Sequence, residues 1–217
     1  MKYSTIIFDL DGTLLDTSEG IMLGASYTVR RMGAAELTID QLKSFIGPPL
    51  LDSFIRECGF IEKEARTAVE LYRERYKEKG IYEAKHYDRI KELLVAIKEM
   101  KGKTAVATLK LDAFAKEMIN HFELLPYFDS INGIDHRDVH SKADIISICL
   151  KELDQQDASK VVMIGDSIYD AIGAEQMGID FIAVTYGYGF KNKEEASQSK
   201  HVFIAETVDE IRAFLEL

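Results

Sequence analysis

The sequence predicts a parallel β-sheet covered by helices on both faces, with an all-helical insertion after the first strand. From residue 88 onward, short apolar runs rich in β-branched residues alternate with stretches whose apolar residues recur at helical spacing. Residues 16–80 show helical patterns and no clear strand. Strands that alternate with helices are typical of parallel α/β sheets, because parallel strands need a crossover connection.

Six apolar runs are predicted as strands, and helical patterns separate most of them. The predicted strands are residues 4–8, 104–108, 130–134, 160–164, 181–185 and 201–204. Three predicted helices between the strands are residues 89–100, 112–122 and 167–177. Two more begin at Ser141 and at the cap formed by Thr207 with Glu210. In such sheets ligands bind beyond the carboxyl ends of the strands, so those ends are searched for chemistry.

The insertion is predicted to hold four helices. They are residues 17–32, a short one that begins at the capping box of Thr38 and Gln41, 50–57 closed by Gly59, and 60–79 ending at Gly80. We therefore expect an α/β domain of residues 1–15 and 81–217 and a helical domain of residues 16–80.

Composition excludes several classes of function. The formal net charge is −10 and no long basic run is present, so nucleic acid is not an expected partner. No apolar run approaches the roughly 20 residues of a membrane span, and the amino terminus enters a strand pattern without a leader. We expect a cytoplasmic protein with no membrane partner. The choice between monomer and homodimer stays open.

Two carboxylates end the first strand. Asp9 and Asp11 lie on the same side of an extended chain, and Gly12 permits the turn that follows. Buried, unpaired acids are costly, so the pair indicates a cation site or a nucleophile with a proton-transfer partner. An acidic turn is the plain alternative. A calcium loop is disfavoured, because Leu14 and Leu15 occupy ligand positions.

Other strand ends and one helix start carry further polar residues. Thr108 ends the second strand, Gly165-Asp166 and Asp170 follow the fourth, and Lys142 begins a helix. Each has an ordinary alternative: Asp166 as a helix cap, Thr108 as a β-branched strand residue, Lys142 as a solvated lysine. Capping explains neither why Gly165 precedes Asp166 nor why Asp170 repeats the charge. The functional interpretation depends on all of them together.

The order of these residues resembles the four motifs of the haloacid dehalogenase-like superfamily. The first motif is Asp9-Leu10-Asp11-Gly12-Thr13, the second and third are Thr108 and Lys142, and the fourth is residues 165–170. Within the superfamily the chain is most similar to the phosphoglycolate phosphatase and 5′-nucleotidase-like branch. Two stretches carry this resemblance: Phe45-Ile46-Gly47-Pro48-Pro49-Leu50 in the insertion and Thr185-Tyr186-Gly187-Tyr188-Gly189 after the later strand. The second motif departs from the common Thr-Ser-Lys by reading Thr108-Leu109-Lys110. The resemblance implies a Rossmann-like core, with residues 16–80 as a cap.

The resemblance also implies a phosphoric monoester hydrolase that uses Mg²⁺. Asp9 would attack phosphorus to give an aspartyl-phosphate, and Asp11 would protonate the leaving oxygen and then activate water. Mg²⁺ would be held by Asp9, the Asp11 main-chain carbonyl and Asp166. Dehalogenases of this superfamily lack the second acid, so Asp11 favours phosphoryl transfer.

The remaining roles are assigned by the same resemblance. Thr108 and Lys142 would hold phosphate oxygens. Asp170 would orient the site or a metal-bound water, and the glycines at 12 and 165 would support the site. Gly47 and Pro48 are candidates for a substrate-facing loop, although Pro48-Pro49 also simply separates two helices.

The expected function is hydrolysis of a small phosphorylated metabolite. Phosphoglycolate, a nucleoside monophosphate, pyrophosphate and a sugar phosphate all fit a small cap. A sugar phosphomutase would need a basic cluster in the cap, and none is evident. A catalytically silent binding protein is disfavoured by the intact motif set. A pure metal-binding module would leave Thr108 and Lys142 without a role.

Overall fold

The computed structural model describes residues 1–136 and 140–217. It divides into an α/β unit, Met1–Leu15 with His86–Leu217, and a helical unit, Asp16–Lys85. The chain returns from the helical unit to the α/β unit after Lys85, whereas the sequence predicted this boundary after residue 80. Residues 81–85 stay with the helical unit because Glu83 pairs with Arg75 at 2.6 Å and its carbonyl accepts the Gly20 N–H at 3.1 Å.

The α/β unit is built on a six-stranded sheet of order β5-β4-β1-β6-β7-β8. Every recorded strand pair in it is parallel. Its strands are β1 (Thr5–Phe8), β4 (Lys103–Leu111), β5 (Ser130–Ile134), β6 (Val161–Gly165), β7 (Asp180–Val184) and β8 (Phe203–Ala205). The predicted fold class is thereby confirmed. Two short strands that the sequence did not reveal, β2 (Leu15–Asp16) and β3 (Lys85–His86), pair where the chain passes between the units.

Both faces of the sheet are buried, which explains the continuous apolar runs in its strands. Successive residues point to opposite faces. Ile7, Ala105 and Met163 belong to one core cluster, while their neighbours Ile6 and Val162 are equally buried. The sheet therefore needs helices on both sides.

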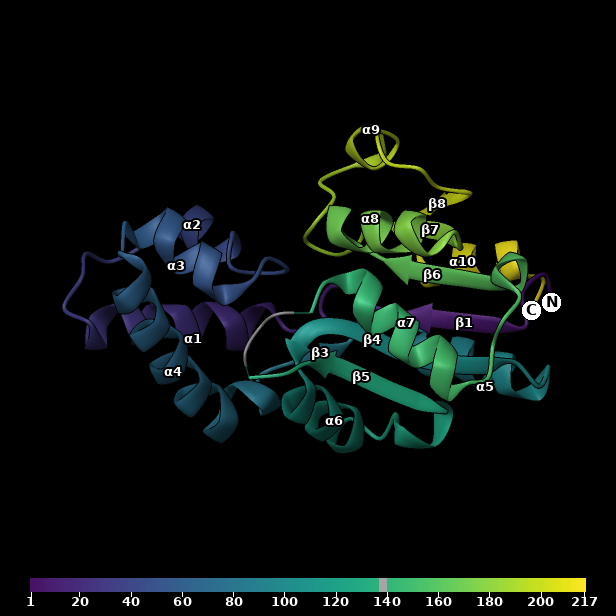
Figure 1. The fold of residues 1–217 in the computed structure, drawn as a ribbon, viewed down its shortest axis with the longest axis horizontal. Coiled ribbons are helices and arrows are strands. Elements are labelled where there is room, and N and C mark those ends of the chain that lie inside the picture. Colours follow the sequence, from purple (N-terminus) through teal and green to yellow (C-terminus); the bar gives the residue numbers. More distant parts are fainter. Residues whose placement is uncertain (137–139) are drawn as a thin grey trace. The chain divides into compact units, whose positions relative to one another are not determined.

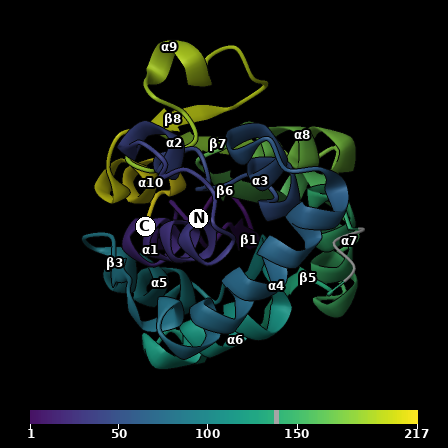
Figure 2. The same cartoon turned by 90° about the vertical axis from the view of Figure 1, so that its left-hand side faces the viewer.

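Helices cover the two faces of this sheet. In Figures 1 and 2, α7 and α8 lie on one side of the strands and α5 and α10 on the other. The helices of this unit are α5 (Ile90–Glu99), α6 (Asp112–His121), α7 (Lys142–Glu152), α8 (Ile168–Met177), α9 (Lys193–Ala196) and α10 (Val208–Leu215). Within residues 1–136 and 140–217, no helix combines the length and apolar character that crossing a membrane requires.

The helical unit is held together by aromatic side chains. Its helices are α1 (Ser18–Arg31), α2 (Ile39–Lys43), α3 (Leu50–Cys58) and α4 (Glu62–Glu78). The Phe54 ring lies 5.0 Å from that of Phe45 and 6.4 Å from that of Tyr72. Helix α1 approaches Tyr72 closely at Gly24, where a Cβ would lie 2.6 Å from the ring.

Helix starts follow the predicted caps. Thr38, Ser141 and Thr207 each accept a hydrogen bond from the backbone N–H three residues on. Helix α3 ends at Gly59, which adopts the left-handed conformation with φ of 68°. These local signals set the boundaries that the sequence predicted well.

Strand β4 differs from its prediction. It continues to Leu111, three residues beyond the predicted end at Thr108. Its pairing with β5 is regular through Ala107 and then shifts before Leu111. Thr108 therefore marks the end of regular pairing and not the end of the strand.

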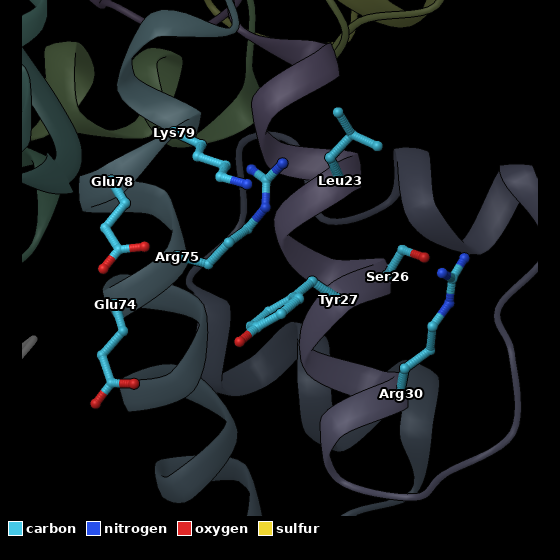
Figure 3. Close-up of a pocket in the computed structure, with 8 residues that line it drawn as sticks. All are labelled: Leu23, Ser26, Tyr27, Arg30, Glu74, Arg75, Glu78 and Lys79. Atoms are coloured by element: carbon cyan, nitrogen blue, oxygen red, sulfur yellow. The ribbon is translucent and has the colours of Figure 1, made fainter.

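A pocket of about 420 Å³ lies within the helical unit, between α1 and α4. Figure 3 shows its lining, in which Tyr27 of α1 and Arg75 of α4 point into the space between these two helices. The cation that is most buried there, Arg75, is paired with Glu83. The lining residues are Leu23, Ser26, Tyr27, Arg30, Glu74, Arg75, Glu78 and Lys79. None of them belongs to the predicted motifs.

Candidate active site

The register of the central strands places the motif residues at one edge of the sheet. Phe8, the last residue of β1, pairs with Val106 on one side and Ile164 on the other. Asp9 therefore lies level with Ala107 and Gly165, and its N–H donates to the Ile164 carbonyl at 2.9 Å. Parallel strands bring their carboxyl ends to a common edge, as the sequence argument required.

Three aspartates meet at this edge. Asp9, Asp166 and Asp170 each offer a carboxylate oxygen, and these oxygens lie within 4.8 Å of one another. All three residues are buried, Asp170 completely. Clustered carboxylates with so little solvent need a positive charge among them. Their hard oxygen donors are the type that Mg²⁺ prefers, so the cluster fits a divalent cation.

Lys142 supplies a positive charge on one side of the cluster. Its Nζ lies 2.8 Å from Asp9 Oδ1 and 2.7 Å from Asp170 Oδ1, and it donates to the Ala107 carbonyl at 3.0 Å. The Lys142 side chain is only 4% exposed. Its aliphatic stem passes over Gly173 of α8, where a Cβ would lie 2.6 Å from Lys142 Cγ. The surface-lysine alternative for Lys142 is therefore wrong.

Ser167 is the N-cap residue of helix α8, and Asp170, not Asp166, completes its capping box. The N–H and the hydroxyl of Ser167 both donate to Asp170 Oδ2, at 3.0 and 2.6 Å. Asp166 instead accepts the backbone N–H groups of Tyr188 and Gly189. The interpretation of Asp166 as a simple cap is thus wrong, because its carboxylate turns toward the Tyr188 loop and away from the helix.

Gly12 and Gly165 are explained by the space around the aspartates. A Cβ on Gly12, whose φ is +77°, would lie 2.1 Å from Asp166 Oδ2. A Cβ on Gly165 would lie 2.4 Å from the Asp170 carboxyl carbon. Each glycine therefore makes room for one acid of the cluster.

Comparison with known proteins identifies the family. A family model described as haloacid dehalogenase-like hydrolase matches residues 6–184. The chain is a haloacid dehalogenase-like hydrolase. The match includes all four motifs, and the family predicted from the sequence is confirmed.

Relatives of this hydrolase carry more than one name. A 5′-nucleotidase of Pseudomonas aeruginosa is 37% identical over 201 residues, covering 93% of this chain and 91% of its own. The tyrosine-protein kinase PtkA of Mycobacterium tuberculosis is 32% identical over 97% of this chain and 72% of its own. The crystal structure of a predicted phosphatase from Clostridium acetobutylicum is 36% identical in sequence and superposes with a TM-score of 0.92. The match covers 100% of this chain and 100% of that chain.

Burial dominates the electrostatics of the hydrolase's acid cluster. Burial raises the pKa of Asp166 to about 8, with further increases from Asp170 and Asp9. Burial also raises the pKa of Asp9 to about 7, against the opposing effect of Lys142. Burial alone would lower the pKa of Lys142, but the carboxylates of Asp170 and Asp9 raise it above its usual range. Lys142 alone therefore does not offset the negative charge that the ionised aspartates of the cluster would carry.

This charge makes the stability of the metal-free hydrolase depend on pH. The pKa values of Asp9 and Asp166, about 7 and 8, exceed the unfolded value of about 4. Between these limits the folded state binds more protons than the unfolded state, so the free energy of unfolding falls as pH rises. We expect a higher melting temperature at pH 5.5 than at pH 8.5 in EDTA, measured by thermal unfolding.

Asp166→Asn provides the control for this pH dependence. The amide keeps the side-chain shape and removes one titrating group, so the variant should lose part of the pH dependence and be more stable than wild type at pH 8.5. An unchanged pH dependence in this variant would assign the effect to other groups.

Asp11 is held by a residue that the sequence analysis did not single out. Lys110 Nζ lies 3.0 Å from both carboxylate oxygens of Asp11, and their side chains are 7% and 13% exposed. The Lys110 N–H also donates to the Thr108 hydroxyl at 3.2 Å. Because β4 continues past Thr108, Lys110 reaches Asp11. The only signal for this contact in the sequence is the lysine that ends the Thr108-Leu109-Lys110 motif.

Replacing Lys110 tests the importance of this ion pair. Lys110→Met retains the length of the side chain and removes its charge, so Asp11 loses a partner on both oxygens. We expect kcat for phosphate release to fall by on the order of tenfold with little change in KM. Asp11 is the predicted proton donor, and a misoriented proton donor affects the chemical step. Lys91→Met, which breaks only the exposed pair with Glu123, is the matched control. Equal kinetics for both variants would contradict this role.

Gly47 and Pro48 lie in the helical unit, between α2 and α3. Gly47 has a φ of +102°, and an added Cβ would meet no atom within 4 Å. The backbone conformation favours glycine here. Their role in substrate selection stays a prediction.

Proposed function

We propose that the hydrolase cleaves a small phosphate monoester with Mg²⁺ through an aspartyl-phosphate on Asp9. It is a phosphoric monoester hydrolase of the haloacid dehalogenase-like family. One observation supports this mechanism most strongly: buried Asp9 contacts Lys142 at 2.8 Å and shares a possible cation site with Asp166. A nucleophilic carboxylate beside a cation site is what attack on an anionic phosphate requires.

The carboxylates of Asp9 and Asp166 and the main-chain carbonyl of Asp11 would hold Mg²⁺. Mg²⁺ when bound would offset the negative charge of the cluster and of the phosphate. The raised pKa values of Asp9 and Asp166, about 7 and 8, support this assignment because they indicate missing positive charge. We keep Asp170 in a positioning role, since both of its oxygens already contact Lys142 or Ser167.

In the first step an Asp9 carboxylate oxygen bonds to phosphorus while the bond from phosphorus to the substrate oxygen breaks. Asp11 gives its proton to that leaving oxygen, and the alcohol departs. In the second step Asp11 takes a proton from water, whose oxygen bonds to phosphorus as the bond to Asp9 breaks. Asp9 is thereby restored and phosphate is released. Thr108 and Lys142 hold phosphate oxygens through both steps.

The helical unit is proposed to act as a cap that excludes water and selects the leaving group. Nucleoside monophosphates lead the proposed substrates, supported by the 5′-nucleotidase relative. Phosphoglycolate, pyrophosphate and sugar phosphates complete the proposed class. The relative named as a tyrosine-protein kinase makes transfer of phosphate to protein tyrosine the second candidate.

A substrate panel tests the proposal. Purified protein is incubated with each phosphate ester and with ATP, in Mg²⁺ or in EDTA, and free phosphate is measured. We expect Mg²⁺-dependent release from at least one monoester. Transfer of label from ATP to tyrosine without release would favour the kinase candidate. Conversion of a sugar phosphate to its isomer would favour a mutase, and inactivity across the panel would favour a silent binding protein.

A further inference from the structure

The Asp166 carboxylate is held by the loop that follows β7. The backbone N–H groups of Tyr188 and Gly189 donate to Asp166 Oδ2 at 2.7 and 2.9 Å. The main-chain carbonyl of Asp166 accepts the Phe190 N–H at 2.7 Å. Both hydrogen bonds to the side chain go to the same oxygen, which leaves Oδ1 for a cation.

This loop lies too close to the motif residues for any larger side chain at its centre. A Cβ on Gly187 would lie 2.3 Å from the Gly12 carbonyl oxygen and 2.4 Å from Asp166 Oδ2. A Cβ on Gly189 would lie 2.5 Å from the Asp166 carbonyl oxygen. Such distances do not occur in real proteins, so a side chain at either position has to displace the loop or the aspartate.

Two further hydrogen bonds hold the start of the loop, while the Phe190 N–H holds its end. The Tyr186 hydroxyl donates to the Thr13 carbonyl at 3.1 Å, which ties the loop to the first motif. The Thr185 N–H donates to the Ala205 carbonyl at 3.0 Å, which ties it to β8. The two N–H groups that reach Asp166 are therefore held in place before any ligand arrives.

We propose that residues 185–190, the Asp166 loop, position this carboxylate for the cation through the backbone of Tyr188 and Gly189. The inference rests on the proposed metal-dependent function and extends it to a segment with no side-chain ligand. Groups that hydrogen-bond to a metal ligand and thereby orient it typically contribute 10–100-fold to metal affinity. The Gly187 and Gly189 positions are then required by the metal site, although neither residue touches the metal.

Binding of Mn²⁺ to the substrate-free protein tests the proposal, with free Mn²⁺ measured by electron paramagnetic resonance. Gly187→Ala pushes on Asp166 Oδ2, and we expect its Kd for Mn²⁺ to be at least tenfold weaker than that of wild type. Gly178→Ala is the matched control: it strains a left-handed residue, φ +65°, with no atom near the new Cβ. This variant should lose stability and retain the wild-type Kd.

The outcomes separate the inference from the function on which it rests. If wild type binds Mn²⁺ tightly, Asp166→Asn does not, and folded Gly187→Ala equals wild type, the loop has no positioning role. If wild type itself fails to bind, the metal-dependent function is wrong. If Gly187→Ala does not fold, Tyr186→Phe takes its place. Loss of its bond to Thr13 should weaken Mn²⁺ binding severalfold, and an unchanged Kd would overturn the proposal.

Discussion

Asp9→Asn is expected to lower Mg²⁺-dependent phosphate release by at least about a thousandfold, equal to about 4 kcal/mol of transition-state stabilisation. A carboxamide has nearly the same shape as the carboxylate but cannot form the bond to phosphorus. Its oxygen can still accept from Lys142, whose Nζ lies 2.8 Å from Asp9 Oδ1. The fold should therefore survive, and kcat should fall without loss of protein.

Two comparisons make this result decisive. Asp209→Asn alters an exposed carboxylate that pairs with Arg89 and should retain wild-type activity. Asp11→Asn retains Asp9, the proposed nucleophile, so a single turnover with a good leaving group should still form a covalent phosphate that is cleaved by hydroxylamine. Wild-type activity in Asp9→Asn would show that the nucleophile is wrongly assigned.

Lys142→Met is expected to have the largest effect on stability, a loss of about 3–5 kcal/mol in the free energy of unfolding. The substitution removes the cation that lies 2.7 Å from Asp170 and 2.8 Å from Asp9. Asp170 has no solvent exposure, so its charge would be left buried and uncompensated. Urea unfolding at pH 8 in EDTA measures the loss.

The double variant Lys142→Met with Asp170→Asn tests the cause. Replacing Asp170 removes the carboxylate that Lys142→Met leaves without its cation. This should restore part of the lost free energy of unfolding, because the coupling between the two residues is electrostatic. Lys116→Met breaks an exposed pair with Asp112 and should change stability by less than about 1 kcal/mol. Additive losses in the double variant would contradict the ion-pair account.

The sequence predicted those parts of the fold that depend on local patterns. Buried strands such as 161–165 and the caps at Thr38 and Ser141 appear because apolar spacing and capping residues act over a few positions. The edge that unites Asp9 and Asp166 also follows from the strand-end rule once the strands are placed.

The contacts of the site were not predictable in the same way. Lys110 reaches Asp11 because β4 continues through an irregular register, and apolar periodicity does not encode such a shift. The donors to Asp166 Oδ2 are main-chain N–H groups from 22 and 23 residues away. Every residue type except proline carries that donor, so residue identity gives no direct signal for it. The only sequence feature that indicates this contact is the pair of glycines at 187 and 189, where larger side chains would clash with the motif residues.

The capping of α8 has a consequence for how this protein can be observed. Asp170 accepts the Ser167 N–H at its Oδ2 and pairs with Lys142 through its Oδ1. Any event that weakens the ion pair should also loosen the first turn of the helix. Amide hydrogen exchange at Ser167 would then report on the charge balance of the site in the absence of substrate. The exchange rate of this one amide would therefore show whether the ion pair between Lys142 and Asp170 is intact, with no attached probe.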